Sequence, residues 1–397
     1  MPGPISFKKG VFLPILLALT LSACGNVRFS VQENGTPVGQ DTDGEAVHPD
    51  VGGATPTPAV TPTATPGGRT VNYSTVVPAN PNQVDILLII DDSGSMKADQ
   101  TKLANRLSGF ASLLESASVP MDWQMCVTVT RDQYTKGAYH WGASNFWEGY
   151  TPPGNTSPWV LKKGTSGLNT IFTKTIDAIG AGVAGSGDER GLKAAYHHFY
   201  NGEPGVIGTS GCYRKDAAVA VIVISDEDER SVAGDCSRLK SDMREDPTSC
   251  KALQNEDLPA TLLAQAKTIF GSSVRFTFNS IVVGDAACEH EQDTTPDDSG
   301  NRSPSHQGTK YLEMSHLTNG GVGSICAADY SANLNLFKDK ILNSLSSLTL
   351  ECTPLPGTLL VSVDGTATNA YTLTGAVLNF SNAIAEGKTV SLTYKCN

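Results

Sequence analysis

Three side chains that carry oxygen donors stand at alternate positions in the segment Asp91-Asp92-Ser93-Gly94-Ser95. Asp91, Ser93 and Ser95 form the pattern D-x-S-x-S, and carboxylate and hydroxyl oxygens are the ligands that a small divalent cation prefers. Asp and Ser also favour turns and helix N-caps, so the motif by itself admits a purely structural interpretation. The residues around the motif favour a metal site.

The residues before the motif predict a strand that is buried on both faces. Val84 and the unbroken apolar run 86–90 are too short to cross a membrane and lack the alternation of a half-exposed strand. A fully apolar strand is typical of the centre of a parallel sheet. Such a strand delivers the polar residues that follow it to the carboxyl edge of the sheet, where α/β folds bind ligands.

A second apolar strand ends in the same way. Residues 217–224 read Ala-Ala-Val-Ala-Val-Ile-Val-Ile, and Ser225 and Asp226 follow directly. Further strands are expected at 123–130 and 274–283, and helices at 102–116, 168–179, 189–200, 260–270, 310–317 and 334–348. Strands that alternate with helices predict an α/β fold with a doubly wound, mostly parallel sheet flanked by helices.

With these strands in place, the D-x-S-x-S motif resembles the metal-ion-dependent adhesion site of von Willebrand factor type A domains, and residues 83–350 would form such a domain. The resemblance implies a divalent cation at the carboxyl edge, usually magnesium, with manganese or calcium as alternatives. It also implies two further ligands from separate loops. Asp226 matches the aspartate that follows a buried strand, and Ser186 takes the family's threonine position, six residues before Leu192.

The chemistry of these residues suits the implied site. The two serines of the motif would bind the cation directly, while Asp91 and Asp226 would act directly or through water. Ser186 keeps the oxygen of the family's threonine and lacks only a methyl group. Asp188 and Glu189 are close enough in sequence to act as alternative ligands.

Three segments interrupt the expected domain, at 131–167, 230–256 and 285–308. The first holds three of the chain's four tryptophans amid Gly and Pro, so it forms either a binding surface or a self-packed cap. The charges of Glu227, Asp228 and Glu229, just before the second segment, are interpreted as those of a solvated loop. The alternative is that one of them contacts the site or a partner.

Residues 351–397 differ from the α/β domain in their pattern of apolar and polar residues. Apolar and polar residues alternate between Gly-containing turns, which predicts a small all-β module after the α/β domain.

The first 24 residues predict an export signal. Lys8 and Lys9 precede a short apolar run at 11–21, and Leu21-Ser22-Ala23-Cys24 resembles the lipobox of bacterial lipoproteins. The resemblance implies that Cys24 becomes the lipidated first residue of the mature chain; the alternative is an ordinary secretory signal cleaved near Ala23. The resemblance also implies the outer membrane, because Gly25 stands where such lipoproteins carry an Asp for retention in the inner membrane. The Pro/Thr-rich residues 25–82 predict a disordered tether.

Nine cysteines in an exported chain predict disulfide bonds. Lipidation of Cys24 would leave eight, an even number. Their spacing suggests four pairs: Cys126–Cys212, Cys236–Cys250, Cys288–Cys326 and Cys352–Cys396.

Composition and motifs narrow the function. The net charge of −11 argues against a nucleic-acid surface. No G-x-S-x-G, H-E-x-x-H or Walker motif is present, so we expect no enzyme. The expected function is a lipid-anchored cell-envelope protein that captures an acidic side chain of a protein ligand through the cation, in adhesion or protein–protein interaction. The alternatives are an envelope component whose metal is purely structural or, less favoured, a metal-dependent hydrolase.

Overall fold

The computed structural model describes most of the chain beyond residue 67. The described residues are 68–77, 82–118, 120–135, 138–152, 158–181, 188–200, 211–243, 245, 250–296, 302–382, 384–385 and 387–397. The predicted signal peptide, Cys24 and most of the predicted tether lie outside this part of the chain. Within it, no helix is both long and apolar enough to cross a membrane.

A six-stranded sheet forms the centre of the described residues, in the order β6-β3-β2-β7-β8-β9. All neighbouring pairs are parallel except the short antiparallel pair of β6 with β3. The strands are β2 (Gln83–Ile90), β3 (Asp122–Val129), β6 (Leu161–Lys162), β7 (Ala218–Ser225), β8 (Phe276–Val282) and β9 (Val322–Ser324). The predicted α/β fold with a mostly parallel sheet is confirmed.

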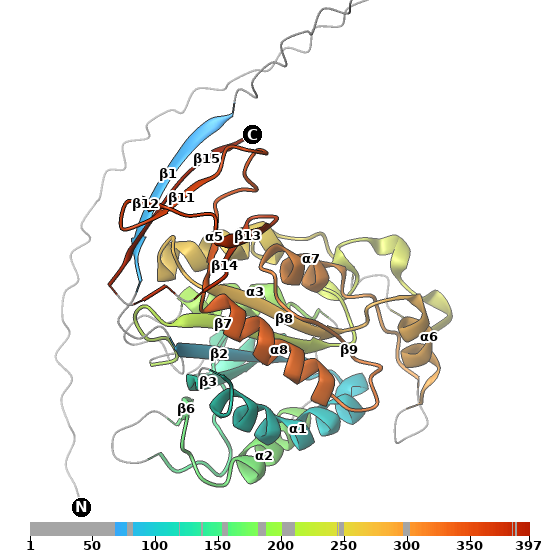
Figure 1. Ribbon diagram of the computed structural model, residues 1–397. Coiled ribbons are helices and arrows are strands. Elements are labelled where there is room, and N and C mark those ends of the chain that lie inside the picture. The colour runs from blue at the N-terminus through green and yellow to red at the C-terminus, as the bar shows by residue number, and fades with distance from the viewer. Residues whose placement is uncertain are drawn as a thin grey trace, which may run out of the picture. The chain divides into compact units, whose positions relative to one another are not determined.

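Helices cover both faces of this sheet (Figure 1). One face carries α1 (Lys97–Glu115), α2 (Leu168–Ala181) and α8 (Ser331–Ser344); the other carries α3 (Gly191–Tyr200), α5 (Pro259–Phe270) and α7 (Thr309–Leu317). The side chains of β2 alternate between the two cores, with Ile86 and Leu88 on the first and Leu87 and Ile89 on the second. The unbroken apolar run in the sequence reflects this burial on both faces.

Shorter elements occupy the connections between these layers. They are β4 (Gln133–Thr135), β5 (Ala138–His140), α4 (Arg230–Ala233), α6 (Ala286–Thr294) and the 3₁₀ turns Gly94–Met96, Cys236–Arg238, Ser241–Met243 and Asn255–Asp257. All of them lie in or beside the predicted insertions, except the 3₁₀ turn Gly94–Met96, which lies within the D-x-S-x-S motif and just after it.

The β module contains more of the chain than the predicted residues 351–397. Residues 69–76 belong to the predicted tether, yet they form β1 (Arg69–Val76), which pairs antiparallel along its whole length with β15 (Thr389–Cys396). Residues 347–349 form β10 (Ser347–Thr349), which pairs with β14 (Val377–Phe380). The other strands are β11 (Leu360–Val363), β12 (Thr366–Ala367) and β13 (Tyr371–Thr374). The α/β domain is therefore inserted between β1 and the rest of the module.

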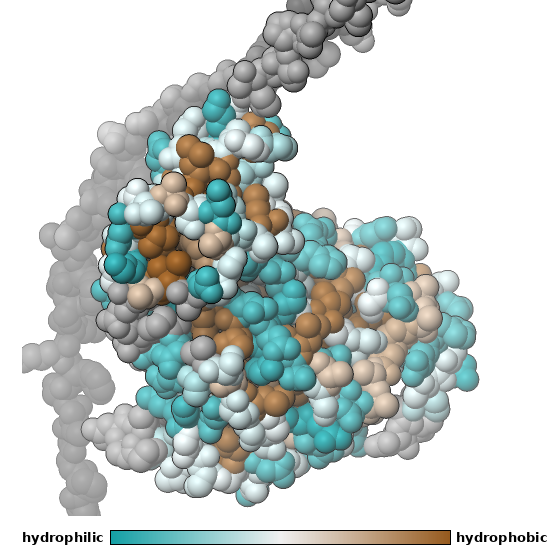
Figure 2. Space-filling model, viewed as in Figure 1, coloured by the Kyte–Doolittle hydropathy of each residue, from teal (hydrophilic) through white to brown (hydrophobic). Residues whose placement is uncertain are grey.

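The small module has a separate apolar core. Its core includes Val71, Val361, Leu392 and Tyr394, whereas Leu360 remains 67% exposed. Figure 2 shows apolar patches on the face of this module that is turned to the viewer. A covalent link is an effective way to stabilise so small a core.

The described part of the chain contains four disulfides, and they confirm the predicted pairings Cys126–Cys212, Cys236–Cys250, Cys288–Cys326 and Cys352–Cys396. The last one joins the segment after β10 to the end of β15 and so closes the β module. Cys126–Cys212 ties the middle of β3 to the chain just before β7, beneath the apolar face that carries α3.

Gly320 lies where the chain passes from α7 to β9. A Cβ at this position would lie 1.8 Å from the backbone oxygen of Phe278 in β8. The adjacent Gly321 donates its N–H to Oδ1 of Asn279 at 2.8 Å, which holds the turn against the same strand. Only glycine allows the two backbones to approach so closely.

We expect Gly320→Ala to lower the free energy of unfolding by about 3 kcal/mol, because the added methyl would collide with backbone that has no room to move. Gly284 is a matched control, since it lies in the exposed turn after β8 and its Cβ would meet no atom within 4 Å. Urea unfolding of Gly284→Ala should differ from the native protein by no more than about 0.5 kcal/mol. Equal losses in the two variants would contradict this account of the turn.

Candidate functional site

The D-x-S-x-S motif and Asp226 meet at the carboxyl edge of the central sheet. Asp91 follows β2 directly and Asp226 follows β7, and these two strands are parallel neighbours with Ile90 opposite Ile224. The Asp91 N–H donates to the carbonyl of Ile224 at 3.0 Å, so the two strand ends are joined by backbone. Two segments far apart in sequence thus deliver their side chains to one place.

Short hydrogen bonds organise the motif. The carboxylate of Asp91 accepts the Ser93 N–H at 2.8 Å on one oxygen and the Ser225 hydroxyl at 2.6 Å on the other. The hydroxyls of Ser93 and Ser95 lie 2.9 Å apart. Ser95 also hydrogen-bonds Asp226, which links the motif to the second strand end.

Four acidic side chains gather here, and we call Asp91, Glu189, Asp226 and Glu227 the acidic cluster. Burial raises the pKa of Asp91 to about 6 and that of Glu227 to about 7. Burial, followed by the charges of Asp91 and Glu227, raises the pKa of Asp226 and of Glu189 well above the usual values. Carboxylates held this close in a dry environment cannot all be ionised without a compensating positive charge.

No side-chain cation of the described residues forms an ion pair with the acidic cluster. The basic residues around it are engaged elsewhere: Arg131 with Asp92, Arg190 with Asp257, Arg230 with Asp188 and Arg238 with Asp228. Asp226 is only 2% exposed, and its Oδ1 is buried without a hydrogen-bond partner. A buried carboxylate oxygen without a partner is rare in folded proteins, and a proton, a water molecule or an ion can satisfy it.

The structure brings together four of the five predicted metal ligands: Asp91, Ser93, Ser95 and Asp226. Ser186 lies outside the described residues. Of its two predicted substitutes, Asp188 forms a bidentate ion pair with Arg230 at 3.0 Å, whereas Glu189 belongs to the acidic cluster.

The acidic run after β7 is not a solvated loop, and that prediction is wrong for Asp228 and Glu229, which are fully buried. Glu229 accepts the N–H groups of Leu192 and Lys193 at 2.7 and 3.1 Å, at the start of α3. Asp228 accepts the Lys310 N–H at 2.9 Å, at the start of α7. Both carboxylates therefore satisfy free N–H groups at helix N-termini.

The backbone after these residues is unusual. Arg230, Ser231 and Ala233 have φ values of 55°, 65° and 54°, in the left-handed region that non-glycine residues rarely adopt. Each such residue costs on the order of 1 kcal/mol, and strain of this kind concentrates at functional sites. In this strained turn the Ser231 hydroxyl donates a hydrogen bond to Oε2 of Glu189 at 2.7 Å.

The aromatic insertion is partly a self-packed cap. Trp147 is buried, and the Trp141 ring lies 5.1 Å from the Arg190 guanidinium and 5.0 Å from the Lys193 amine. These contacts hold the insertion against the start of α3, beside the acidic cluster. The sequence allows either a binding surface or a cap, and Trp141 and Trp147 belong to a cap.

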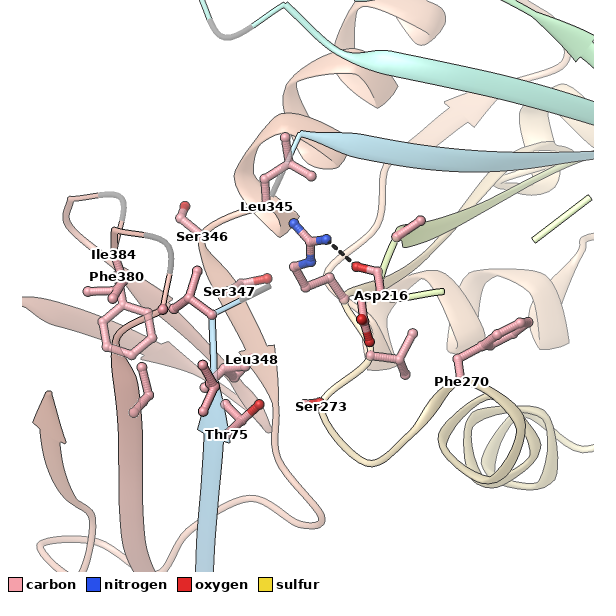
Figure 3. Close-up of a pocket in the computed structure, with 17 residues that line it drawn as sticks. Thr75, Asp216, Phe270, Ser273, Leu345, Ser346, Ser347, Leu348, Phe380 and Ile384 are labelled. Atoms are coloured by element: carbon pink, nitrogen blue, oxygen red, sulfur yellow. Dashed lines mark hydrogen bonds between the residues drawn. The ribbon is translucent and has the colours of Figure 1, made fainter. Parts of the chain in front are cut away.

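A cavity of about 450 Å³ lies at the opposite, amino edge of the sheet, between the β module and the α/β domain (Figure 3). It contains none of the predicted site residues. Arg275 is buried there and donates to the carbonyl of Asp216 at 2.8 Å, and apolar residues such as Phe270, Leu348 and Phe380 form much of the wall.

The acidic cluster could hold a cation only with help from hydroxyl groups or water. In the part of the chain that the structure describes, no three His, Cys, Asp or Glu side chains are arranged as a ready-made metal group. Ser93 and Ser95 would supply the missing ligands, and they are half-buried beside the exposed Gly94. A hard cation with oxygen ligands and retained waters fits this set of donors, whereas a soft metal does not.

No protein-family model and no curated protein matches the chain. Among solved structures it is similar to a pilus adhesin, SpaC from Lactobacillus rhamnosus GG, at 12% identity and a TM-score of 0.35, over 84% of this chain and 42% of that one. Proximal thread matrix protein 1 from the mussel byssus matches at 12% identity and 0.34, over 71% and 52%. Manganese-loaded TRAP protein from Plasmodium vivax matches at 12% and 0.30, over 80% and 100%.

The chain thus spans about half of the mussel protein and less than half of the adhesin. The order and direction of the strands in the central sheet are compatible with a von Willebrand factor A-like fold.

Asp228→Ala should lower the free energy of unfolding by about 4 kcal/mol, because it leaves Arg238 and the start of α7 without their buried acceptor. The measurement is urea unfolding followed by circular dichroism. Asp242→Ala removes an exposed carboxylate from the neighbouring insertion and should cost no more than about 0.5 kcal/mol. A small loss for Asp228→Ala would restore the interpretation of a solvated loop.

Proposed function

We propose that this protein is a lipid-anchored binding protein of the cell envelope that captures an acidic side chain of a protein ligand through a divalent cation. The observation that carries the proposal is the acidic cluster. Three of its four carboxylates are buried and Glu227 is half-buried, it lacks an ion-pair partner among the described residues, and it stands beside two serine hydroxyls. A divalent cation would balance charges that otherwise destabilise the fold.

The ligands follow from the geometry of the donors. Ser93 and Ser95 would bind Mg²⁺ directly, and Mn²⁺ and Ca²⁺ are the alternative ions. Asp91 already accepts hydrogen bonds on both oxygens, so it suits a role through water. Asp226 offers the oxygen that has no partner, and Glu189 joins Ser186 as a candidate for the third loop.

Capture of a partner requires one open coordination position. Gly94 is exposed and the two motif serines are only half-buried, so this side of the site faces solvent. A cation that keeps exchangeable waters there could take a Glu or Asp carboxylate from another protein. This open side favours partner binding over a purely structural metal, and the absence of catalytic motifs favours binding over hydrolysis.

Anchoring is the second part of the proposal. Cys24 would carry the lipid, and the Pro/Thr-rich residues that follow would separate the domain from the membrane. We infer the outer membrane from Gly25, and mass spectrometry of the membrane-extracted protein would test the lipid directly.

Titration calorimetry with Mg²⁺ and Mn²⁺ should detect one site in the native protein. Ser95→Ala and Asp226→Ala should each weaken binding at least about tenfold, because each removes a ligand or its support. Asp216→Ala is the matched control, since that exposed carboxylate lies at the opposite edge of the sheet. Ser95→Ala, Asp226→Ala and EDTA should each abolish the crosslinking of envelope proteins to the domain. Crosslinking that persists in these variants and in EDTA would overturn the proposal.

The pH dependence has a defined sign. Without metal, the folded protein holds protons on Asp91 and Glu227 with pKa values of about 6 and 7, above their ordinary 3.8 and 4.5. The folded state then binds more protons than the unfolded state, so this contribution to stability is present at low pH and is lost as pH rises through about 4 to 7. Metal binding needs the ionised carboxylates and therefore strengthens over the same range.

We accordingly expect the melting temperature in EDTA to fall relative to that in Mg²⁺ as the pH rises from about 5 to 8. Differential scanning calorimetry of both forms at each pH measures the gap. A gap that stays constant over this range would show that the acidic cluster does not ligate the ion.

A further inference from the structure

A second cavity, of about 400 Å³, opens beside the central sheet between the aromatic insertion and helix α2. Its lining from the insertion includes Gln133, Asn145, Phe146 and Trp159 together with Glu148, and Ile179 of α2 closes the other side. This lining combines aromatic rings with amide and carboxylate groups. Nothing in the cation-binding proposal makes use of it.

The wall of this cavity is held rigidly. The Asn145 N–H donates to the carbonyl of Val127 in β3 at 2.8 Å, and the Glu148 N–H donates to the Thr175 hydroxyl in α2 at 2.9 Å. Between them, the Trp147 indole is buried and donates to the Met125 carbonyl at 3.1 Å. Since Trp147 anchors the segment inward, the neighbouring Phe146 is turned outward on a fixed backbone.

Phe146 is the exposed half of an aromatic pair. Its ring stacks on Trp159 with centroids 4.8 Å apart and planes inclined by 26°, yet 53% of Phe146 is exposed. Trp159 is itself held by the Trp147 indole, which donates to its carbonyl at 3.0 Å. A large ring kept in water by a rigid scaffold is available for contact with a ligand.

Hydrogen-bonding groups stand next to the rings. Oδ1 of Asn145 is buried and has no hydrogen-bond partner. The Ser144 hydroxyl lines the same cavity, 2.9 Å from Nε2 of the buried His198, and the Gln133 amide is fixed at 2.6 Å on the carbonyl of Ala143. An unsatisfied buried acceptor is unfavourable unless a ligand supplies a donor.

We propose that this cavity binds a pyranose ring of a neutral saccharide. The C–H face of a sugar packs on an aromatic ring, while its hydroxyls act as donors to acceptors such as Oδ1 of Asn145 and the carboxylate of Glu148. An extended apolar ligand would leave these polar groups unpaired, and an anion would meet the Glu148 carboxylate. The lining therefore favours a neutral ligand with many hydroxyl groups.

The saccharide site adjoins the acidic cluster without sharing its ligands. Helix α2 continues from Ile179 to Gly180, which packs so closely on Gln100 that a Cβ would lie 2.3 Å from its Oε1. Gln100 in turn donates to the carbonyl of Asp91 at 2.8 Å. A glycan-bearing protein ligand could thus contact both sites, while sugar binding itself needs no cation.

Saturation-transfer NMR of the full chain tests this proposal, with lactose, maltotriose, cellotriose and triacetylchitotriose as probes. At least one should bind with an affinity in the millimolar range or tighter, and EDTA should leave that affinity unchanged. Phe146→Ala should weaken it roughly fivefold and Asn145→Ala by a similar factor, since each removes one contact.

Tyr200→Ala is the matched control, because it removes a ring that is 55% exposed on α3 and lies outside the cavity. It should leave sugar binding unchanged, and circular dichroism should show all three variants folded. Failure of every sugar to bind, or binding that survives both cavity variants, would overturn the proposal. Preferential binding of a peptide with the Thr/Pro sequence of residues 55–66 would overturn it as well.

Discussion

Repulsion among buried carboxylates is the constraint around which the α/β domain is arranged. Asp91 and Asp226 are brought together because β2 and β7 are parallel neighbours that end at the same level. Glu189 and Glu227 add two more acids to the same volume. A fold tolerates such a group only if protons or a cation neutralise it, so the ionisation of these residues and the occupancy of the site are coupled.

The surroundings of the acidic cluster keep its charge from being cancelled by the protein itself. Each neighbouring arginine is paired with another carboxylate, as Arg131 is with Asp92 and Arg238 with Asp228. Helix N-termini, which also attract negative charge, are occupied by Asp228 and Glu229. The strained turn at Arg230 and Ser231 positions Glu189 in the cluster. Among the described residues, these pairings leave the acidic cluster without a cationic side chain of its own, so protons or a bound cation must neutralise it.

The β module and the aromatic insertion show how the rest of the chain is attached to this domain. β1 precedes the α/β domain and pairs with β15 after it. Val77, just after β1, and Leu345, just before β10, both line the cavity at the amino edge of the sheet. The carboxyl edge is therefore left to the candidate cation site. The insertion caps its flank through Trp141 and presents Phe146 to solvent.

The sequence by itself determined the features that depend on local pattern: the buried strands, the flanking helices, the four disulfide pairs and the D-x-S-x-S motif with Asp226. It did not predict β1, since eight alternating residues in a Thr/Pro-rich context carry little signal without their partner strand. Only the tertiary structure decided that Asp228 and Glu229 cap helices and that Glu189 joins the acidic cluster. Those roles depend on which helix ends and strand ends meet in the fold. The sequence of an acidic segment does not distinguish a solvated loop from a buried one.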